Sequence, residues 1–127
     1  MTHILRVVYS SKVEKPLFWL GSSRSDTRAF PVRARRAAGY QLLRVQQGLD
    51  PTDWKPVASV GAGVREIRIQ VGTAHRVFYV ARFAEGVYVL HAFEKPTRKM
   101  AMGDIELARG RFRNLLQRRR KDDDAKG

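Results

Sequence analysis

The chain has 127 residues, 43% of them hydrophobic, which suits one domain with its own core and no need for a disulfide or metal to hold it together. It contains no cysteine, which excludes disulfides, thiolate catalysis and thiolate metal sites. Its 25 Lys and Arg outweigh 12 Asp and Glu by +13, so we expect a polyanionic partner: nucleic acid first, then an anionic membrane surface, then an acidic protein.

The first 14 residues contain only a short apolar run that is broken by Arg6, unlike a signal peptide. No window of the sequence approaches the roughly 18 apolar residues of a transmembrane helix. We therefore expect a soluble, cytoplasmic protein without a membrane partner, in which residues 1–14 are an N-terminal extension or an extra strand.

A single domain is predicted over residues 15–119. It opens with a short strand at residues 17–20 and a helical turn at residues 28–30. From residue 31 to residue 47 the apolar residues recur every three or four positions, which predicts a helix. The two helical segments are expected to form a hairpin, and a brief strand is predicted at residues 56–59.

Three strand-like runs then follow at residues 64–71, 75–83 and 86–93. Their short links predict an antiparallel meander. A last helix is predicted from about Gly103 to Arg119, with a polar, disordered tail at residues 120–127. The order predicts an α+β fold in which an N-terminal helical hairpin packs on a small antiparallel β-sheet, with a C-terminal helix.

The candidate site is cationic. Arg68 and Arg76 lie in two predicted neighbouring strands, and His91 and Lys95 share one face if the third strand continues. Buried or half-buried cations need a reason, and binding the phosphates of RNA is one. RNA cleavage uses the 2′-hydroxyl as an internal nucleophile, so cations and one proton-transferring group, His91 or a lysine, suffice without a metal.

Simpler structural roles exist for the same residues. Arg68 could pair with Glu66 or Glu94, and His91 could be a core histidine. Lys95, Arg98 and Lys99 could belong to an exposed loop. The spacing of the three histidines fits no metal site, and no phosphate-binding glycine loop or serine nucleophile motif is present, so no metal or cofactor is expected.

The chain resembles the RelE/HigB-like toxins of bacterial and phage toxin–antitoxin modules, including their phage-derived Gp49-like group. The matching segments are KPLFWLGSSRSDTRAF, AGYQLLRVQQGLDPTDWKP, VGAGVREIRI, HRVFYVARF, VYVLHAFEKPTRK and DIELARGRF. The resemblance implies a RelE-like fold and a toxin that cleaves mRNA without a metal, often on the translating ribosome. It also implies neutralisation by an antitoxin from an adjacent gene, often a helix-turn-helix protein.

By motif, the resemblance assigns catalysis to Arg68, Arg76, His91 and Lys95, with Arg76 at the scissile phosphate. RNA binding is expected of Arg65, Arg98 and Lys99. Where relatives carry two adjacent lysines after LHAF, this chain has Lys95 followed by Pro96, which removes one cation. Two alternatives therefore remain: a ParE-like gyrase inhibitor without enzymatic activity, and a catalytically weak basic protein that binds RNA or the ribosome.

Overall fold

The computed structural model of the chain describes residues 14–97 and 101–126. The predicted N-terminal extension therefore lies, but for its last residue, outside the described residues. The elements in chain order are β1 (Leu17–Trp19), α2 (Ser23–Arg28), α3 (Val32–Gln46), β2 (Trp54–Pro56), β3 (Val64–Val71), β4 (Thr73–Val80), β5 (Val87–Glu94) and α4 (Met102–Lys126).

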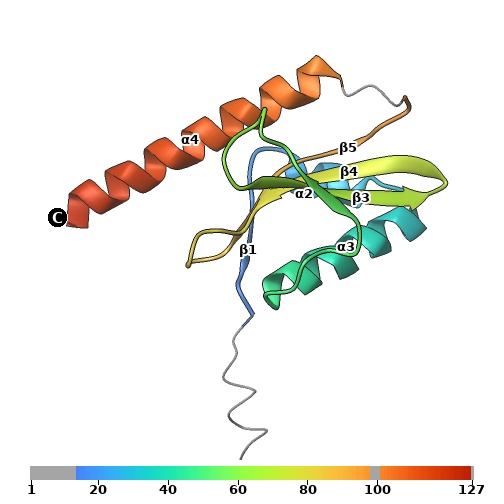
Figure 1. Ribbon diagram of the computed structural model, residues 1–127, viewed down its shortest axis with the longest axis horizontal. Helices are drawn as coiled ribbons and strands as arrows, with labels where there is room; N and C mark the ends of the chain where they lie inside the picture. The colour runs from blue at the N-terminus through green and yellow to red at the C-terminus, as the bar shows by residue number, and fades with distance from the viewer. Residues whose placement is uncertain (1–13, 98–100, 127) are drawn as a thin grey trace, which may run out of the picture.

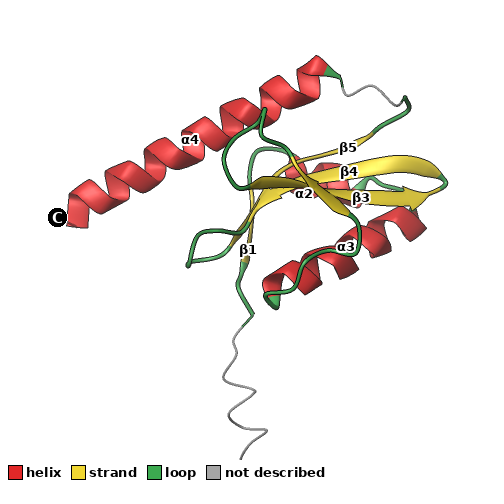
Figure 2. Ribbon diagram, in the orientation of Figure 1, coloured by secondary structure: helices red, strands yellow, loops and turns green. Residues whose placement is uncertain are grey.

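Within the described residues, the strands form one five-stranded sheet in the order β1-β5-β4-β3-β2 (Figure 2). β3 pairs with β4 and β4 with β5 in antiparallel fashion, as the meander predicted, and β2 is also antiparallel to β3. β1, however, pairs with β5 in parallel, so the sheet is mixed and the prediction of an antiparallel sheet was wrong. Parallel neighbours need a long connection, and here the whole domain between β1 and β5 supplies it.

The predicted N-terminal helical hairpin is not seen. The first described element is the strand β1, and the short helix α2 packs on β5 whereas the longer α3 lies over β3. The buried residues of α2 are the polar Ser23 and Thr27, and the Ser23 hydroxyl donates to the Val89 carbonyl at 3.1 Å. A six-residue helix without an apolar face cannot bury much apolar surface against α3. The hydrogen bond of Ser23 holds it on the sheet instead.

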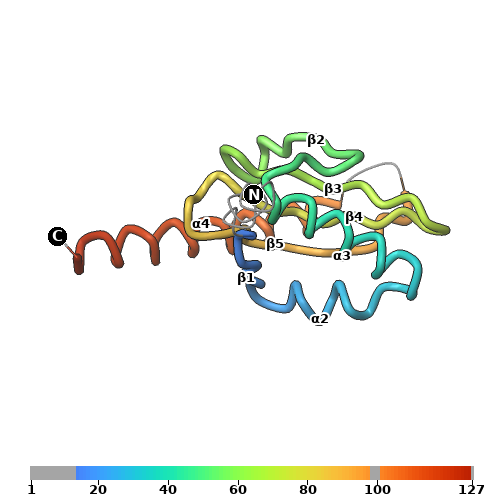
Figure 3. The backbone as a smooth tube through the Cα atoms, turned by 90° about the horizontal axis from the view of Figure 1, so that it is seen from below, coloured from blue at the N-terminus to red at the C-terminus, as the bar shows by residue number. Residues whose placement is uncertain are grey.

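α3 and α4 cover opposite faces of the sheet (Figures 1 and 3). We call the face under α4 the α4 face, and its core includes Val64, Phe78 and Leu90. We call the other the α3 face, and its core includes Ile67 and Val77. Because side chains alternate along a strand, each residue of β3 and β4 is assigned to one face by its position relative to these core residues.

The C-terminal helix is longer than the sequence predicted. α4 continues to Lys126, so residues 120–126 are helical and not an irregular tail. Its buried residues end at Leu115, and the last turns project beyond the sheet (Figure 3). Across the described ranges 14–97 and 101–126, no helix is long and apolar enough to cross a membrane.

Candidate functional site

Three of the predicted site residues meet at one end of the α4 face. Arg68 of β3 lies directly opposite Arg76 of β4, and Arg76 lies opposite Phe93 of β5. Lys95 follows the end of β5, and its backbone N–H donates to the Ala74 carbonyl at 2.7 Å, which ties it to β4. Strand pairing thus brings together Arg68 and Lys95, which are 27 positions apart in the sequence.

These residues line an open cleft of about 600 Å³. α4 packs mainly over β5, whereas the cleft lies at the β3–β4 hairpin, which contributes Gln70, Thr73 and Ala74. The full lining of the cleft is Lys55, Arg68, Gln70, Thr73, Ala74, Arg76, Lys95, Pro96 and Thr97. Its described lining therefore holds four cationic side chains and no carboxylate or imidazole.

Lys55, the fourth of these cations, was missed by sequence reasoning. It lies in β2, opposite Glu66 of β3, and its residue is exposed. The segment DPTDWKP reads as irregular, because a three-residue strand carries no periodic signal. Its pairing with β3, which brings Lys55 to the cleft, is a tertiary feature.

Arg76 forms the buried floor of the cleft, with 3% of its surface exposed. Its Nη1 donates to the His75 carbonyl at 3.0 Å, and its Nε lies 3.8 Å from Oε2 of the buried Glu66. Burial lowers the pKa of Arg76, the Glu66 carboxylate opposes this by attraction, and the neighbouring Arg68 adds to the lowering. A guanidinium keeps its proton despite such a shift, so Arg76 places a fixed positive charge beneath the cleft.

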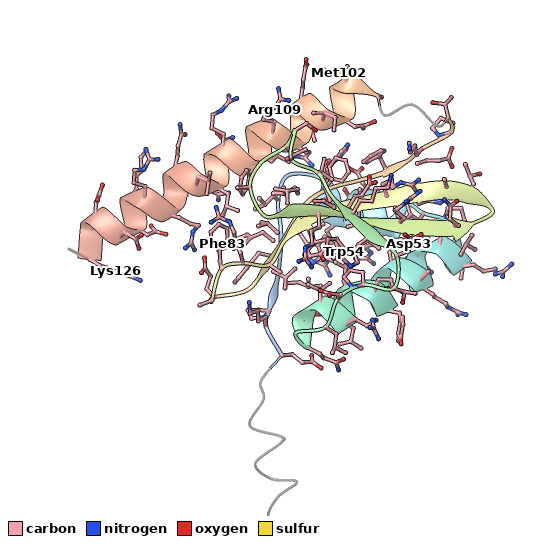
Figure 4. The ribbon with its side chains drawn as sticks, viewed as in Figure 1. Asp53, Trp54, Phe83, Met102, Arg109 and Lys126 are labelled. Atoms are coloured by element: carbon pink, nitrogen blue, oxygen red, sulfur yellow. The ribbon has the colours of Figure 1, made fainter. Side chains whose placement is uncertain are left out.

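Arg68 is the more accessible arginine, with 29% of its side chain exposed. The carboxylates suggested by the sequence are engaged elsewhere: Glu66 faces Arg76, and Glu94 lies 3.6 Å from the ring of His75. The acid nearest to Arg68 is Asp53, at 4.0 Å, in the segment before β2 (Figure 4). At that distance the ion pair is weak, and the guanidinium remains available to an anionic ligand.

His91 does not line the cleft. Its ring stacks on Phe93 with centroids 4.8 Å apart and meets Phe78 edge-on. Its Nε2 lies 2.7 Å from Oδ1 of Asp104, in the first turn of α4, and 7% of the residue is exposed. In this geometry His91 links β5 to the first turn of α4. This position fits the alternative drawn from the sequence, in which His91 is a core histidine.

Arg65 lies on the α3 face, opposite to Arg68, because it is an odd number of residues away in the same strand. Its guanidinium is 2.9 Å from the Asp50 carboxylate and stacks over the Trp54 ring at 3.8 Å. The structure therefore does not bring Arg65 to the cleft. Arg98 and Lys99 lie outside the described residues, just after the cleft residue Thr97.

Acidic and histidine side chains do not gather into a metal site anywhere in the described residues: no group of three or more has a suitable arrangement. In contrast, the cleft offers what an anionic ligand needs, which is several cations from four different segments at one open surface.

A comparison with curated proteins found no match. A family model, that of the phage-derived protein Gp49-like family (DUF891), matches residues 25–113. This range includes α3, all of the strands from β2 to β5, and the cleft between them. The match covers more than half of the chain, and the chain therefore belongs to the Gp49-like family of phage-derived proteins.

Proposed function

We propose that the protein is the toxin of a type II toxin–antitoxin module and acts as a metal-independent endoribonuclease on mRNA. The observation that carries the proposal is the convergence of Lys55, Arg68, Arg76 and Lys95 on one open cleft. Membership of the Gp49-like family is consistent with a toxin of this kind.

In the proposed reaction a solvent water takes the proton of the RNA 2′-hydroxyl, the 2′-oxygen forms a bond to the adjacent phosphorus, and the bond from phosphorus to the 5′-oxygen breaks. Arg68 and Lys95 hold the phosphate, and the buried charge of Arg76 adds to the field that stabilises the doubly negative, pentavalent transition state. Lys95 donates a proton to the departing 5′-oxygen, since an ammonium group has protons to give and lies in the cleft. The products are a 2′,3′-cyclic phosphate and a 5′-hydroxyl.

We further propose that cleavage takes place on the ribosome. The net charge of +13 attracts the protein to ribosomal RNA, whose phosphates are negatively charged. Such binding should weaken steeply with salt, because each contacted phosphate releases counterions on binding. Neutralisation by an antitoxin from an adjacent gene, expected to be a helix-turn-helix protein, completes the module.

The test is inducible expression in bacteria of the wild type, of Arg68→Gln combined with Lys95→Gln, and of Arg36→Gln as a control. Arg36 is exposed on α3, on the far side of the sheet from the cleft. Growth is followed, and mRNA 5′ ends are mapped with and without an inhibitor of translation initiation. We expect arrest and new 5′-hydroxyl ends for the wild type and the control, and neither for the cleft variant.

Two other outcomes would replace the proposal. Arrest without new RNA ends, accompanied by DNA damage signalling, would identify a ParE-like gyrase inhibitor. A specific observation favours the remaining alternative, a catalytically weak RNA- or ribosome-binding protein: His91 is held away from the cleft by Asp104. That alternative predicts salt-sensitive ribosome binding that Arg68→Gln weakens, without arrest or new RNA ends.

A further inference from the structure

A second hollow of about 600 Å³ lies far from the cationic cleft, between β1 and the C-terminal half of α4. We call it the β1 groove. Its lining is Leu17, Phe18, Trp19, Leu20, Gly21, Arg24, Tyr88, Leu115, Arg118, Arg119 and Asp122. Residues 17–21 all contribute, although alternate side chains of a strand point to opposite faces, so the groove follows the edge of the strand itself.

The outer edge of β1 has backbone groups to offer. The Pro16 carbonyl accepts from Val87, and the Leu20 N–H donates to Val89, so these positions face β5. The intervening Leu17 and Trp19 therefore direct their N–H and C=O groups away from β5. No other strand pairs with this side of β1 in the described part of the chain. An open edge of this kind is a template for an added strand.

The floor of the groove is apolar and aromatic. The Phe18 ring packs against the Tyr88 ring with centroids 5.0 Å apart, and 39% of Phe18 is exposed. The Phe18 ring passes close over Gly86, where an added Cβ would lie 2.5 Å from a ring atom. Such a half-exposed aromatic, fixed by its neighbours, can anchor a partner's side chain at a low entropic cost.

The rim of the groove is basic. Arg24 of α2 and Arg118 of α4 are exposed on its two sides. Arg119 stacks over the Phe83 ring at 3.8 Å and pairs with Glu85. Phe83 lies below the C-terminal half of α4 (Figure 4). The acidic residue of the rim is Asp122. The excess of positive charge beside an apolar floor complements a segment with acidic and apolar side chains.

We propose that the β1 groove is a protein-docking site that takes an extended acidic segment of a partner as an additional strand on β1. The segment's backbone bonds with Leu17 and Trp19, its apolar side chains cover Phe18, and its carboxylates meet Arg24 and Arg118. Naming the antitoxin as the source of this segment rests on the proposed function. A protein segment is favoured over RNA because strand addition needs a peptide backbone and the floor lacks the cations of the other cleft.

The experiment uses the purified product of the adjacent gene as the probe and measures its affinity for the full chain by calorimetry. The groove variant is Arg24→Glu with Arg118→Glu, and the matched control is Arg113→Glu, an exposed arginine of α4 outside the groove. We expect the groove variant to bind at least about tenfold more weakly and the control to bind like the wild type. Thermal melting confirms that both variants are folded.

Amide exchange of the complex supplies a second readout that does not depend on a substitution. The amides of Leu17 and Trp19 should exchange more slowly in the complex, because strand addition gives them acceptors. The inference is overturned if the probe fails to bind, if it binds the groove variant as well as the wild type, or if exchange at these two amides is unchanged. It is also overturned if the groove variant instead loses affinity for a short single-stranded RNA.

The fate of the proposed function is read separately, from mapped RNA ends with the Arg68→Gln and Lys95→Gln variant. If the wild type makes no new RNA ends but the groove variant loses the partner, the docking site stands and the endoribonuclease does not. If the wild type cuts RNA but the partner binds the groove variant as tightly as the wild type, the endoribonuclease stands and the docking site does not.

Discussion

Arg68 and Arg76 are directly opposed on adjacent antiparallel strands, with both side chains on the α4 face. Like charges at opposed positions destabilise a sheet. Among the described residues, the carboxylates that pair with them are Asp53, 4.0 Å from Arg68, and Glu66, 3.8 Å from Arg76. Such a pair therefore costs stability, and binding an anion between the two side chains would recover it.

The first prediction follows from this repulsion. Arg68→Gln should raise the free energy of unfolding by about 0.5 kcal/mol, measured by urea denaturation at low salt, because it removes one of two opposed charges. In a background that already carries Arg76→Gln the same substitution should give no gain. A loss of stability on Arg68→Gln would mean that the pair with Asp53 outweighs the repulsion.

Glu66 is expected to contribute to folding stability by compensating the buried charge of Arg76. Its side chain is buried, with Oε2 beside the Arg76 Nε, so Glu66→Gln removes the carboxylate nearest to a buried cation without changing the volume of the core. We expect a loss of about 3 kcal/mol in chemical denaturation. Glu106→Gln, at an exposed position of α4, should change stability by less than about 0.5 kcal/mol. An equally small effect at Glu66 would show that Arg76 does not depend on it.

The role of His91 can be decided by comparing stability with activity. If it holds β5 to α4, Asp104→Ala should cost about 1 to 2 kcal/mol and speed amide exchange in the first turn of α4. His91→Gln should then lower RNA cleavage by less than about tenfold. A loss of about a hundredfold or more, with the fold intact, would instead identify a proton-transfer role and reinstate His91 as a catalytic residue.

Tyr79 is expected to make the free energy of unfolding fall at alkaline pH. Burial raises the pKa of its phenol, and the nearby Arg65 only partly opposes this. The unfolded chain therefore loses this proton first, from about pH 10 upward, so the stability contributed by Tyr79 is complete below that pH and is lost as pH rises toward the folded-state pKa. Tyr79→Phe should flatten the fall in unfolding free energy above about pH 10, whereas Tyr40→Phe, at a residue 57% exposed, should not.

Several features of this protein were determined by its sequence alone. The period of the apolar residues located α3 to within one residue at each end, and the alternation in VREIRIQV located β3. α3 buries one regular stripe, and β3 places its alternating isoleucines in the core of the α3 face, so local sequence and tertiary packing agree. The cationic character of the site was also readable, because Arg68, Arg76 and Lys95 are charges placed in or beside apolar strands.

Other features were decided only by tertiary structure. The parallel pairing of β1 depends on which strand lies beside it after the whole chain has folded. The sequence of a three-residue strand does not indicate whether it will pair in parallel or antiparallel fashion. Strand register brought Lys55 into the cleft and sent Arg65 to the opposite face, because a shift of one position reverses the side of the sheet on which a residue lies. The sequence thus set which cations the protein has, and strand pairing set which of them meet at one open cleft.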